Sequence, residues 1–194
     1  MKPWNIFLIF LTLSGPVLVP CCLAPQQATP VRGALEEPAA PPGDEGPEVT
    51  GIFLEGWIGA AFGSYDAARI APWAETARRY GHGPGKGLLL KIESASVEPA
   101  EATAEGTVAL KMTYSVLPPG TDPSVLVTEK RLIVRSDGAL VANPRVRVDR
   151  TGGTYSSIVH VALPMNVRKG LYSVTCTLET AGAADRMEAA FTVK

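Results

Sequence analysis

Apolar and polar residues alternate along most of the chain beyond residue 88. The clearest case is Leu171 to Glu179, where Ser or Thr separates apolar and aromatic residues. A period of two places one side of an extended strand in a core and the other side in solvent. Short strands at this spacing predict two packed antiparallel sheets. The seven predicted strands cover residues 88–97, 107–117, 125–135, 139–150, 155–163, 171–179 and 186–193.

The third predicted strand carries an irregularity. Its apolar phase slips at Glu129-Lys130-Arg131, so we expect a bulge or a bend between sheets there. The next strand places Val146 and Val148 inward and Arg145 and Arg147 outward. Basic side chains are therefore expected on the outer surface of the sandwich, and these are Lys130, Arg131, Arg145 and Arg147.

Three short motifs extend this pattern: Leu163-Pro164, Gly170-x-Tyr172 and the closing Phe191-Thr192-Val193. With them, residues 88–194 resemble bacterial immunoglobulin-like and fibronectin-like envelope modules. The resemblance implies a seven-stranded antiparallel sandwich. It also implies a tyrosine corner, in which the Tyr172 hydroxyl returns to nearby backbone. Such motifs mark a fold and do not assign an activity.

Cys176 departs from antibody-type domains, which pair a cysteine on the second strand with one on the sixth. The predicted second strand offers no cysteine, so we expect Cys176 to be a buried, inert thiol. A disulfide with Cys21 or Cys22 is the alternative.

Residues 49–80 contain small residues at intervals of four. On a helix these rows would form one broad face that lets another backbone approach closely. The segment resembles the glycine-zipper stretches of bacterial envelope proteins, and this implies a helix-packing face. Its members are Gly56, Gly59, Ala60, Gly63, Ser64, Ala67, Ala68 and Ala71.

Charged residues within this segment oppose a full membrane span, because a bilayer penalises Glu55, Asp66 and Arg69. Two placements therefore remain open: a helix docked on the sandwich or on another subunit, and a membrane-associated helix. Pro72 is expected to end or kink the helix, with a second short helical piece reaching Arg79. Residues 81–87 are glycine-rich and predict a flexible hinge, since their spacing does not fit a phosphate-binding loop.

The N-terminal residues 1–22 predict a secretory signal peptide, with Lys2 before a short apolar run. Leu18-Val19-Pro20-Cys21 resembles the lipobox of bacterial lipoproteins, except at Pro20. This resemblance implies acylation at Cys21 or Cys22, and ordinary cleavage after Ala24 is the alternative. Residues 23–48 are rich in Pro, Ala and Glu and predict a disordered linker.

The composition limits the candidate chemistry. Hydrophobic residues make up 46% of the chain and charged residues 19%, so a hydrophobic core is expected. The net charge of −1 does not provide the positive field that nucleic-acid binding requires. The two histidines, His82 and His160, are expected in a loop and on an outer face. Neither completes a catalytic triad or a zinc-ligand spacing. We therefore expect no enzymatic activity, no catalytic residues, no cofactor, no metal and no small-molecule substrate.

Together these patterns predict a non-enzymatic envelope protein that is exported and lipid-anchored. Its location would be the periplasm or outer membrane, with the cell surface as an alternative. Its role would be structural or protein-binding. The partner would be an envelope protein or a second copy, reached through the small-residue helix, and the acyl chain would bind the membrane. The alternative is a membrane-inserted oligomer built on the glycine-zipper segment, with the sandwich as an accessory domain.

Overall fold

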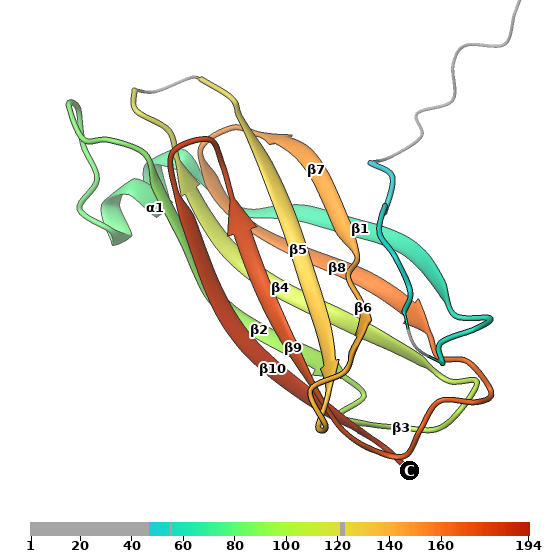
Figure 1. The fold of residues 1–194 in the computed structure, drawn as a ribbon. Helices are drawn as coiled ribbons and strands as arrows, with labels where there is room; N and C mark the ends of the chain where they lie inside the picture. The colour runs from blue at the N-terminus through green and yellow to red at the C-terminus, as the bar shows by residue number, and fades with distance from the viewer. Residues whose placement is uncertain (1–46, 55, 121–122) are drawn as a thin grey trace, which may run out of the picture. The chain divides into compact units, whose positions relative to one another are not determined.

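A computed structural model describes residues 47–194 except 55, 121 and 122, which form a pair of β-sheets packed face to face (Figure 1). One sheet has the order β1-β8-β4-β2, and the other has the order β3-β10-β9-β5-β6, with β7 also on β5. Neighbouring strands are antiparallel except β3 and β10. The strands are β1 Ala61–Pro72, β2 Leu89–Glu98, β3 Glu101–Ala102, β4 Thr107–Leu117, β5 Val125–Arg135, β6 Leu140–Ala142, β7 Arg145–Arg150, β8 Gly153–Ala162, β9 Gly170–Glu179 and β10 Ala184–Val193.

This arrangement confirms the predicted mainly-β, immunoglobulin-like sandwich. The bounds of β4 and β5 are those that the alternation predicts, and β2, β8, β9 and β10 lie close to theirs. The predicted strand 139–150 is divided into β6 and β7 at Asn143-Pro144. Proline has no backbone N–H to give to a ladder, so a strand is readily interrupted there.

The core lies between the two sheets and takes alternate residues from each strand. On β4 the inward residues are fully or almost fully buried, as their period predicts. Their counterparts on β9 are also buried, and they include Cys176. The inward residues of these two strands are Val108, Leu110, Met112, Tyr114, Val116, Tyr172, Val174, Cys176 and Leu178.

The predicted small-residue helix is wrong, because most of its second half is strand β1. β1 pairs antiparallel with β8 from Ala61↔Ala162 to Pro72↔Gly153, with two irregularities in register. The edge of β8 supplies hydrogen-bond partners along the segment, and Gly and Ser have little intrinsic preference for a helix. Small residues at intervals of four also fit a strand, because residues four apart lie on the same face of a strand.

The predicted helix-packing face is therefore not a single surface. Gly56 and Gly59 lie in the loop before β1, with φ of 79° and 86° that favour glycine. Ala60 directly precedes the strand. The other members lie along β1 and face both sides of the sheet, and they are Gly63, Ser64, Ala67, Ala68 and Ala71.

The segment before β1 is also paired, but with the other sheet. Thr50 bridges to Arg145 and Phe53 bridges to Ala142, so residues 49–54 follow the edge made by β6 and β7. Gly51 permits this approach, since a Cβ there would lie 2.4 Å from the carbonyl oxygen of Asn143. Residues 49–72 thus contact one sheet and then extend the other. We call them the N-terminal clamp.

The predicted start of the sandwich at residue 88 is too late, because the N-terminal clamp is part of it. Residues 81–87 join β1 and α1 to β2, and β1 and β2 belong to the same sheet. The sandwich therefore begins well before residue 88, and the glycine-rich stretch is a loop within it. No helix among the described residues has the length and apolar character needed to cross a bilayer.

The helix α1 (Trp73–Arg79) confirms the short helical piece expected up to Arg79. Thr76 is fully buried, and its hydroxyl lies 2.9 Å from the Thr154 hydroxyl on β8. The ring of Trp73 packs directly on Gly152, and a Cβ added to Gly152 would lie only 2.1 Å from Trp73 Cδ1.

Replacing Gly152 by Ala should therefore destabilise the protein. The added methyl group must displace the Trp73 ring, and overpacking of this kind costs about 1–3 kcal/mol. Urea unfolding of the full chain measures this loss. Gly83→Ala is the matched control, because a Cβ there meets open space, and an equal effect of the two changes would contradict the packing described for Trp73.

Candidate functional site

Two charged residues of β5, Glu129 and Arg131, lie in the interior of the sandwich. Val127, Glu129, Arg131 and Ile133 all face the interior and are fully buried. The pairing of β5 with β9 continues through these positions without a shift in register. The predicted bulge is therefore wrong, and Arg131 is not on the outer surface. The other three basic residues expected there are not buried. Lys130, Arg145 and Arg147 each follow or precede buried residues along their strands and face the opposite side.

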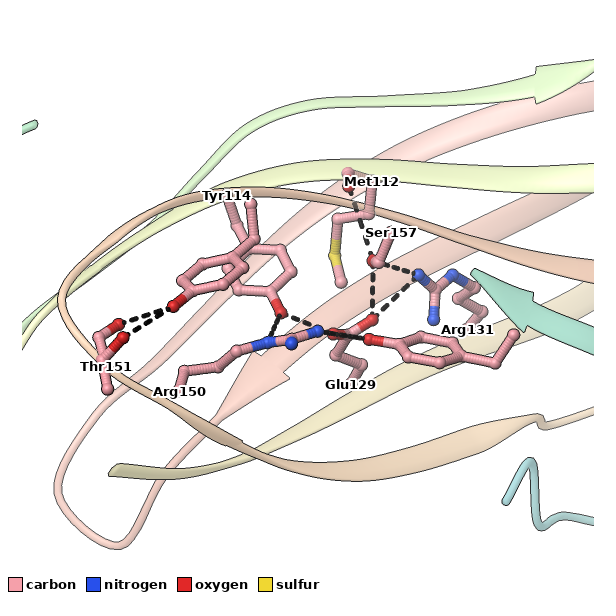
Figure 2. Close-up of polar contacts among 9 residues, drawn as sticks. Met112, Tyr114, Glu129, Arg131, Arg150, Thr151 and Ser157 are labelled. Atoms are coloured by element: carbon pink, nitrogen blue, oxygen red, sulfur yellow. Dashed lines mark hydrogen bonds and ion pairs between the residues drawn. The ribbon is translucent and has the colours of Figure 1, made fainter. Parts of the chain in front are cut away.

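Glu129 is the centre of a cluster of polar side chains between the sheets (Figure 2). Its Oε1 accepts hydrogen bonds from the hydroxyls of Tyr65 at 2.7 Å and Tyr114 at 2.6 Å. Its Oε2 accepts from Ser157 Oγ at 2.7 Å and from Arg131 Nη2 at 3.0 Å. Oε1 also accepts from Arg150 Nη2 at 3.4 Å, so each carboxylate oxygen has at least two donors and burial of the charge is compensated.

Arg150 closes the other side of the cluster. Its Nε donates to the Tyr114 hydroxyl at 2.8 Å, and its Nη2 donates to the Tyr65 hydroxyl at 2.5 Å. The guanidinium carbon lies 4.5 Å from the ring centroid of Tyr155, in cation–π geometry. We call the set the inter-sheet network, and it comprises Tyr65, Tyr114, Glu129, Arg131, Arg150 and Ser157.

The network joins elements that are distant in sequence. Tyr65, Tyr114 and Ser157 come from β1, β4 and β8 of one sheet, and the three charged residues come from β5 and β7 of the other. Its hydrogen bonds therefore run across the interface between the sheets. Tyr65 in particular attaches the N-terminal clamp to the opposite sheet.

The surroundings shift the acid–base equilibria of these groups. Burial favours the neutral form of Glu129, but the charge of Arg131 and the hydrogen bonds from Tyr114, Ser157 and Tyr65 outweigh it. The pKa of Glu129 is therefore below its usual value, and the residue is a carboxylate at neutral pH. Burial and the Glu129 charge raise the pKa of Tyr65 and of Tyr114, so both remain neutral donors.

Arg131 is held less completely than Glu129. Its Nη2 also donates to Ser157 Oγ at 2.7 Å, while Nε and Nη1 are buried and have no hydrogen-bond partner among the described residues. Cys176 is its cross-strand neighbour on β9. Burial raises the pKa of the Cys176 thiol, which is free. The predicted buried, unpaired cysteine is confirmed.

The network holds the sheets together and is not arranged as an accessible reaction site. Glu129 and Arg131 have no exposed surface, and Arg150 is only 12% exposed. A solute cannot touch the carboxylate unless β1 or β7 moves away.

One end of the sandwich, around Tyr172, has the features of a binding surface. The Tyr172 hydroxyl donates to the carbonyl oxygen of Arg168 at 2.6 Å, which confirms the predicted tyrosine corner. The Trp57 ring packs against Tyr172 with 5.9 Å between centroids, and the Phe191 ring stacks on Tyr172 at 5.2 Å. The corner therefore fixes the loop 163–169 and the loop before β1 against the same core residue.

Two adjoining cavities open at this end, and both are lined by Arg135. The first, of about 230 Å³, is lined by Gly56, Trp57, Arg135, Asn166 and Arg168. The second, of about 510 Å³, is lined by Leu54, Arg135, Asp137, Gly138, Ala139 and Leu140. We call the two together the corner groove. Ile58 and Met165, the sequence neighbours of Trp57 and Asn166, are 83% and 75% exposed.

The remaining predicted residues do not gather into a site. Cys21 and Cys22, the predicted signal peptide and most of the predicted linker lie outside the described residues. His160 lies 3.5 Å from Asp66 across β8 and β1, and both side chains are partly exposed. In residues 47–194, apart from the three that are not described, no group of His, Cys, Asp and Glu is arranged to hold a metal ion.

Comparisons with known proteins identify no family. No protein-family model matches the chain, and no curated protein matches it. Among solved structures, a DNA glycosylase of Pseudomonas fluorescens, AlkC, is 17% identical with a TM-score of 0.39, over 63% of this chain and 35% of that one. This chain thus spans about a third of the glycosylase.

Two smaller proteins are also similar. A CARDB domain of Pyrococcus furiosus, solved with di-metal ions, is 13% identical with a TM-score of 0.36, over 58% of this chain and 91% of that one. Self-complemented MyfA, the major subunit of Myf fimbriae from Yersinia enterocolitica, is 15% identical with a TM-score of 0.39, over 55% of this chain and 98% of that one. The strand pairing of this chain itself shows the sandwich.

Replacing Glu129 by Gln should destabilise the protein and change its response to acid. Removing one partner of a buried ion pair leaves Arg131 uncompensated and costs roughly 3–5 kcal/mol. The folded-state pKa of Glu129 lies below its unfolded value, so its contribution is present above the unfolded pKa and is lost as pH falls through the folded pKa. Urea unfolding from neutral to acidic pH should show this acid loss in the wild type and less of it in Glu129→Gln. Equal acid slopes would contradict the assignment.

Replacing Tyr65 by Phe should loosen the N-terminal clamp. The change removes the hydroxyl between Glu129 and Arg150 and keeps the ring, at an expected cost of about 1–3 kcal/mol. Hydrogen exchange measures the effect locally, and amides in the β1–β8 pair should exchange faster than in the wild type. Tyr155→Phe is the control, because its hydroxyl bonds only to Thr151 and not to Glu129. Unchanged exchange in Tyr65→Phe would show that the hydroxyl does not secure β1.

Proposed function

We propose that this protein is a non-enzymatic, exported binding module that contacts another protein at the corner groove end of its sandwich. The observation that carries this proposal is that two exposed apolar residues, Ile58 and Met165, directly adjoin in sequence the cavity-lining residues Trp57 and Asn166. Ile58 and Met165 leave most of their surface in water, and burial of such side chains stabilises protein complexes.

The geometry of this end supports a preformed surface. The Tyr172–Arg168 hydrogen bond fixes the loop that carries Met165, and Trp57 fixes the loop that carries Ile58. Exposed residues on loops that a rigid sandwich positions are a common way of building a binding site. A rigid surface also loses little conformational entropy when a partner binds.

Export and anchoring complete the proposal. The pattern of residues 1–22 supports secretion, and Cys21 and Cys22 are the candidate sites of acylation. A lipid on either cysteine, joined to the sandwich through residues 23–48, would hold the module near a membrane of the envelope, in the periplasm or at the outer membrane.

The alternative of a membrane-inserted glycine-zipper oligomer does not belong to the proposal. It requires a helix through Gly56, Gly59 and Gly63, whereas the first two lie in a loop and the third lies in β1. Self-association remains compatible with the proposed surface, with a second copy as the partner protein.

Site-specific photo-cross-linking tests the binding surface. A photoreactive amino acid at Met165 should give a discrete adduct in intact cells, and the same residue at Thr113, on the outer face of β4, should not. The additional change Ile58→Asp should abolish the Met165 adduct without lowering the melting temperature, because Ile58 is exposed. Equal adducts at Met165 and Thr113, or an adduct that Ile58→Asp leaves unchanged, would contradict the proposed surface.

Metabolic labelling with an alkyne fatty acid tests the anchor. The wild-type chain should carry the label, and the double change Cys21→Ser and Cys22→Ser should remove it because the acceptor thiols are lost. Cys176→Ser is the control and should keep the label, since Cys176 is buried. An unlabelled wild-type chain would exclude lipidation.

A further inference from the structure

We propose that the free edge of β1 binds an extended segment of another protein, which adds to the sheet as an antiparallel strand. The segment that fits this edge has an acidic residue, an aliphatic residue and a basic residue at its first, second and fourth positions. This inference goes beyond the proposed binding surface, because no residue of β1 lines the corner groove. It is carried by the unpaired backbone of β1, by a hollow beside it and by two exposed charges.

The backbone of β1 has one unpaired edge. β1 ends the sheet β1-β8-β4-β2, and among the described residues it pairs only with β8. From Tyr65 to Arg69 this pairing runs without a shift in register, so the strand is regular there. The outward N–H and C=O groups of such an edge are a template for a further strand. An added strand gains main-chain hydrogen bonds, and side-chain contacts then select its sequence.

The two charged side chains of this stretch lie on opposite faces of the sheet. Arg69 is exposed and lies opposite Tyr155, which is buried on the inner face, so Arg69 is on the inner side. Asp66 is on the outer side, where its carboxylate is 3.5 Å from His160 Nε2 and its side chain is 63% exposed. An added strand therefore meets a positive charge on its inner side and a negative charge on its outer side, three positions apart.

A hollow on the outer face lies beside the same edge. Its volume is about 220 Å³, and it is lined by Asp66, Ala67, Ala68, Ser156 and Ile158. Ala68 has only a methyl group as its side chain, so a long aliphatic side chain on the added strand can extend over it toward Ile158. Burying apolar surface in this way favours binding.

These positions define the partner segment in an antiparallel register. Its acid lies opposite Arg69, its aliphatic residue lies opposite Ala68, and its base lies opposite Asp66. One further residue separates the aliphatic residue from the base. Cross-strand pairs of opposite charge stabilise a sheet, and like charges directly opposite each other destabilise it. From its N-terminus the segment is therefore acid, aliphatic, any residue, base.

The β1 strand of a second copy does not meet this requirement. A closed dimer through this edge has a two-fold axis perpendicular to the sheet, and such an axis keeps outer faces with outer faces. Asp66 is on the outer side and Arg69 is on the inner side, so the two are not cross-strand partners in that dimer. The charges of the edge are matched only by a different strand.

Titration of the full-length protein with capped peptides, followed by NMR at the amides of residues 65–70, tests the inference. The matching peptide is acetyl-Thr-Glu-Leu-Thr-Lys-Val-Thr-amide. The charge-exchanged peptide, acetyl-Thr-Lys-Leu-Thr-Glu-Val-Thr-amide, has the same composition. The matching peptide should give saturable shifts, and the charge-exchanged peptide should bind at least about threefold more weakly, as two exposed charge pairs predict. Replacing Leu by Ala in the matching peptide should also weaken binding several-fold, because the hollow is then unfilled.

Two N-methylated forms of the matching peptide test the backbone pairing. One is methylated at the Leu nitrogen and the other at the nitrogen of the Thr that follows it. Neighbouring N–H groups of an extended strand point to opposite edges, so one of the two faces β1 and the other faces solvent. One methylation should abolish binding, and the other should change Kd by less than about twofold. Binding that survives both methylations would overturn the inference.

Charge exchange on the protein tests the same pairs from the other side. The double change Asp66→Lys and Arg69→Glu should reverse the order of the two peptides, an outcome that a loss of stability does not produce. The matched control is Arg186→Glu with Glu188→Lys, two exposed residues of β10 in the other sheet, and it should leave the order unchanged. Equal binding of the two peptides, the absence of a saturable shift, or an order that the β1 exchange does not reverse would each overturn the inference.

Discussion

The fold depends on one buried carboxylate and the groups that compensate it. Glu129 lies in the interface between two sheets where an uncompensated charge would be strongly unfavourable. Every donor that stabilises it must therefore be brought to the same place, and these donors come from both sheets. An apolar core would be satisfied by many packings. The hydrogen bonds at Glu129 are directional, so they also restrict how the sheets can be placed relative to each other.

This constraint explains why the N-terminal clamp belongs to the sandwich. β1 is an edge strand with mostly exposed side chains, and apolar burial alone would hold it weakly. Tyr65 gives it a hydrogen bond to the opposite sheet, while Thr50 and Phe53 pair the preceding segment with that sheet's edge. The clamp in turn places Trp57 against the tyrosine corner. The proposed binding end is therefore built on contacts that begin at the network.

The alternation of residues was sufficient to predict the sandwich, because strands such as β4 and β9 have one apolar and one polar side. It also placed Tyr172 and Cys176 on the buried side of β9, while the tyrosine corner came from the resemblance to immunoglobulin-like modules. It failed at β5, where Arg131 was expected on the outer surface and a bulge or bend was expected at Glu129-Lys130-Arg131. The strict alternation of Glu129 and Arg131 with Val127 and Ile133 was a usable signal of their burial. It failed again at β1, where small residues fit a helix or a strand and the edge of β8, distant in sequence, determines the outcome. The corner groove combines several loops, so no local pattern marks it.

The central claim is that Tyr65 and Glu129 act together across the sheets. A double-mutant cycle of Tyr65→Phe and Glu129→Gln, measured as free energies of unfolding at neutral pH, tests it most directly. The hydrogen bond between the two residues predicts that the combined loss differs from the sum of the single losses by about 1 kcal/mol or more. Additivity to within about 0.3 kcal/mol would show that the residues are independent, and would contradict this account of what holds the sandwich together.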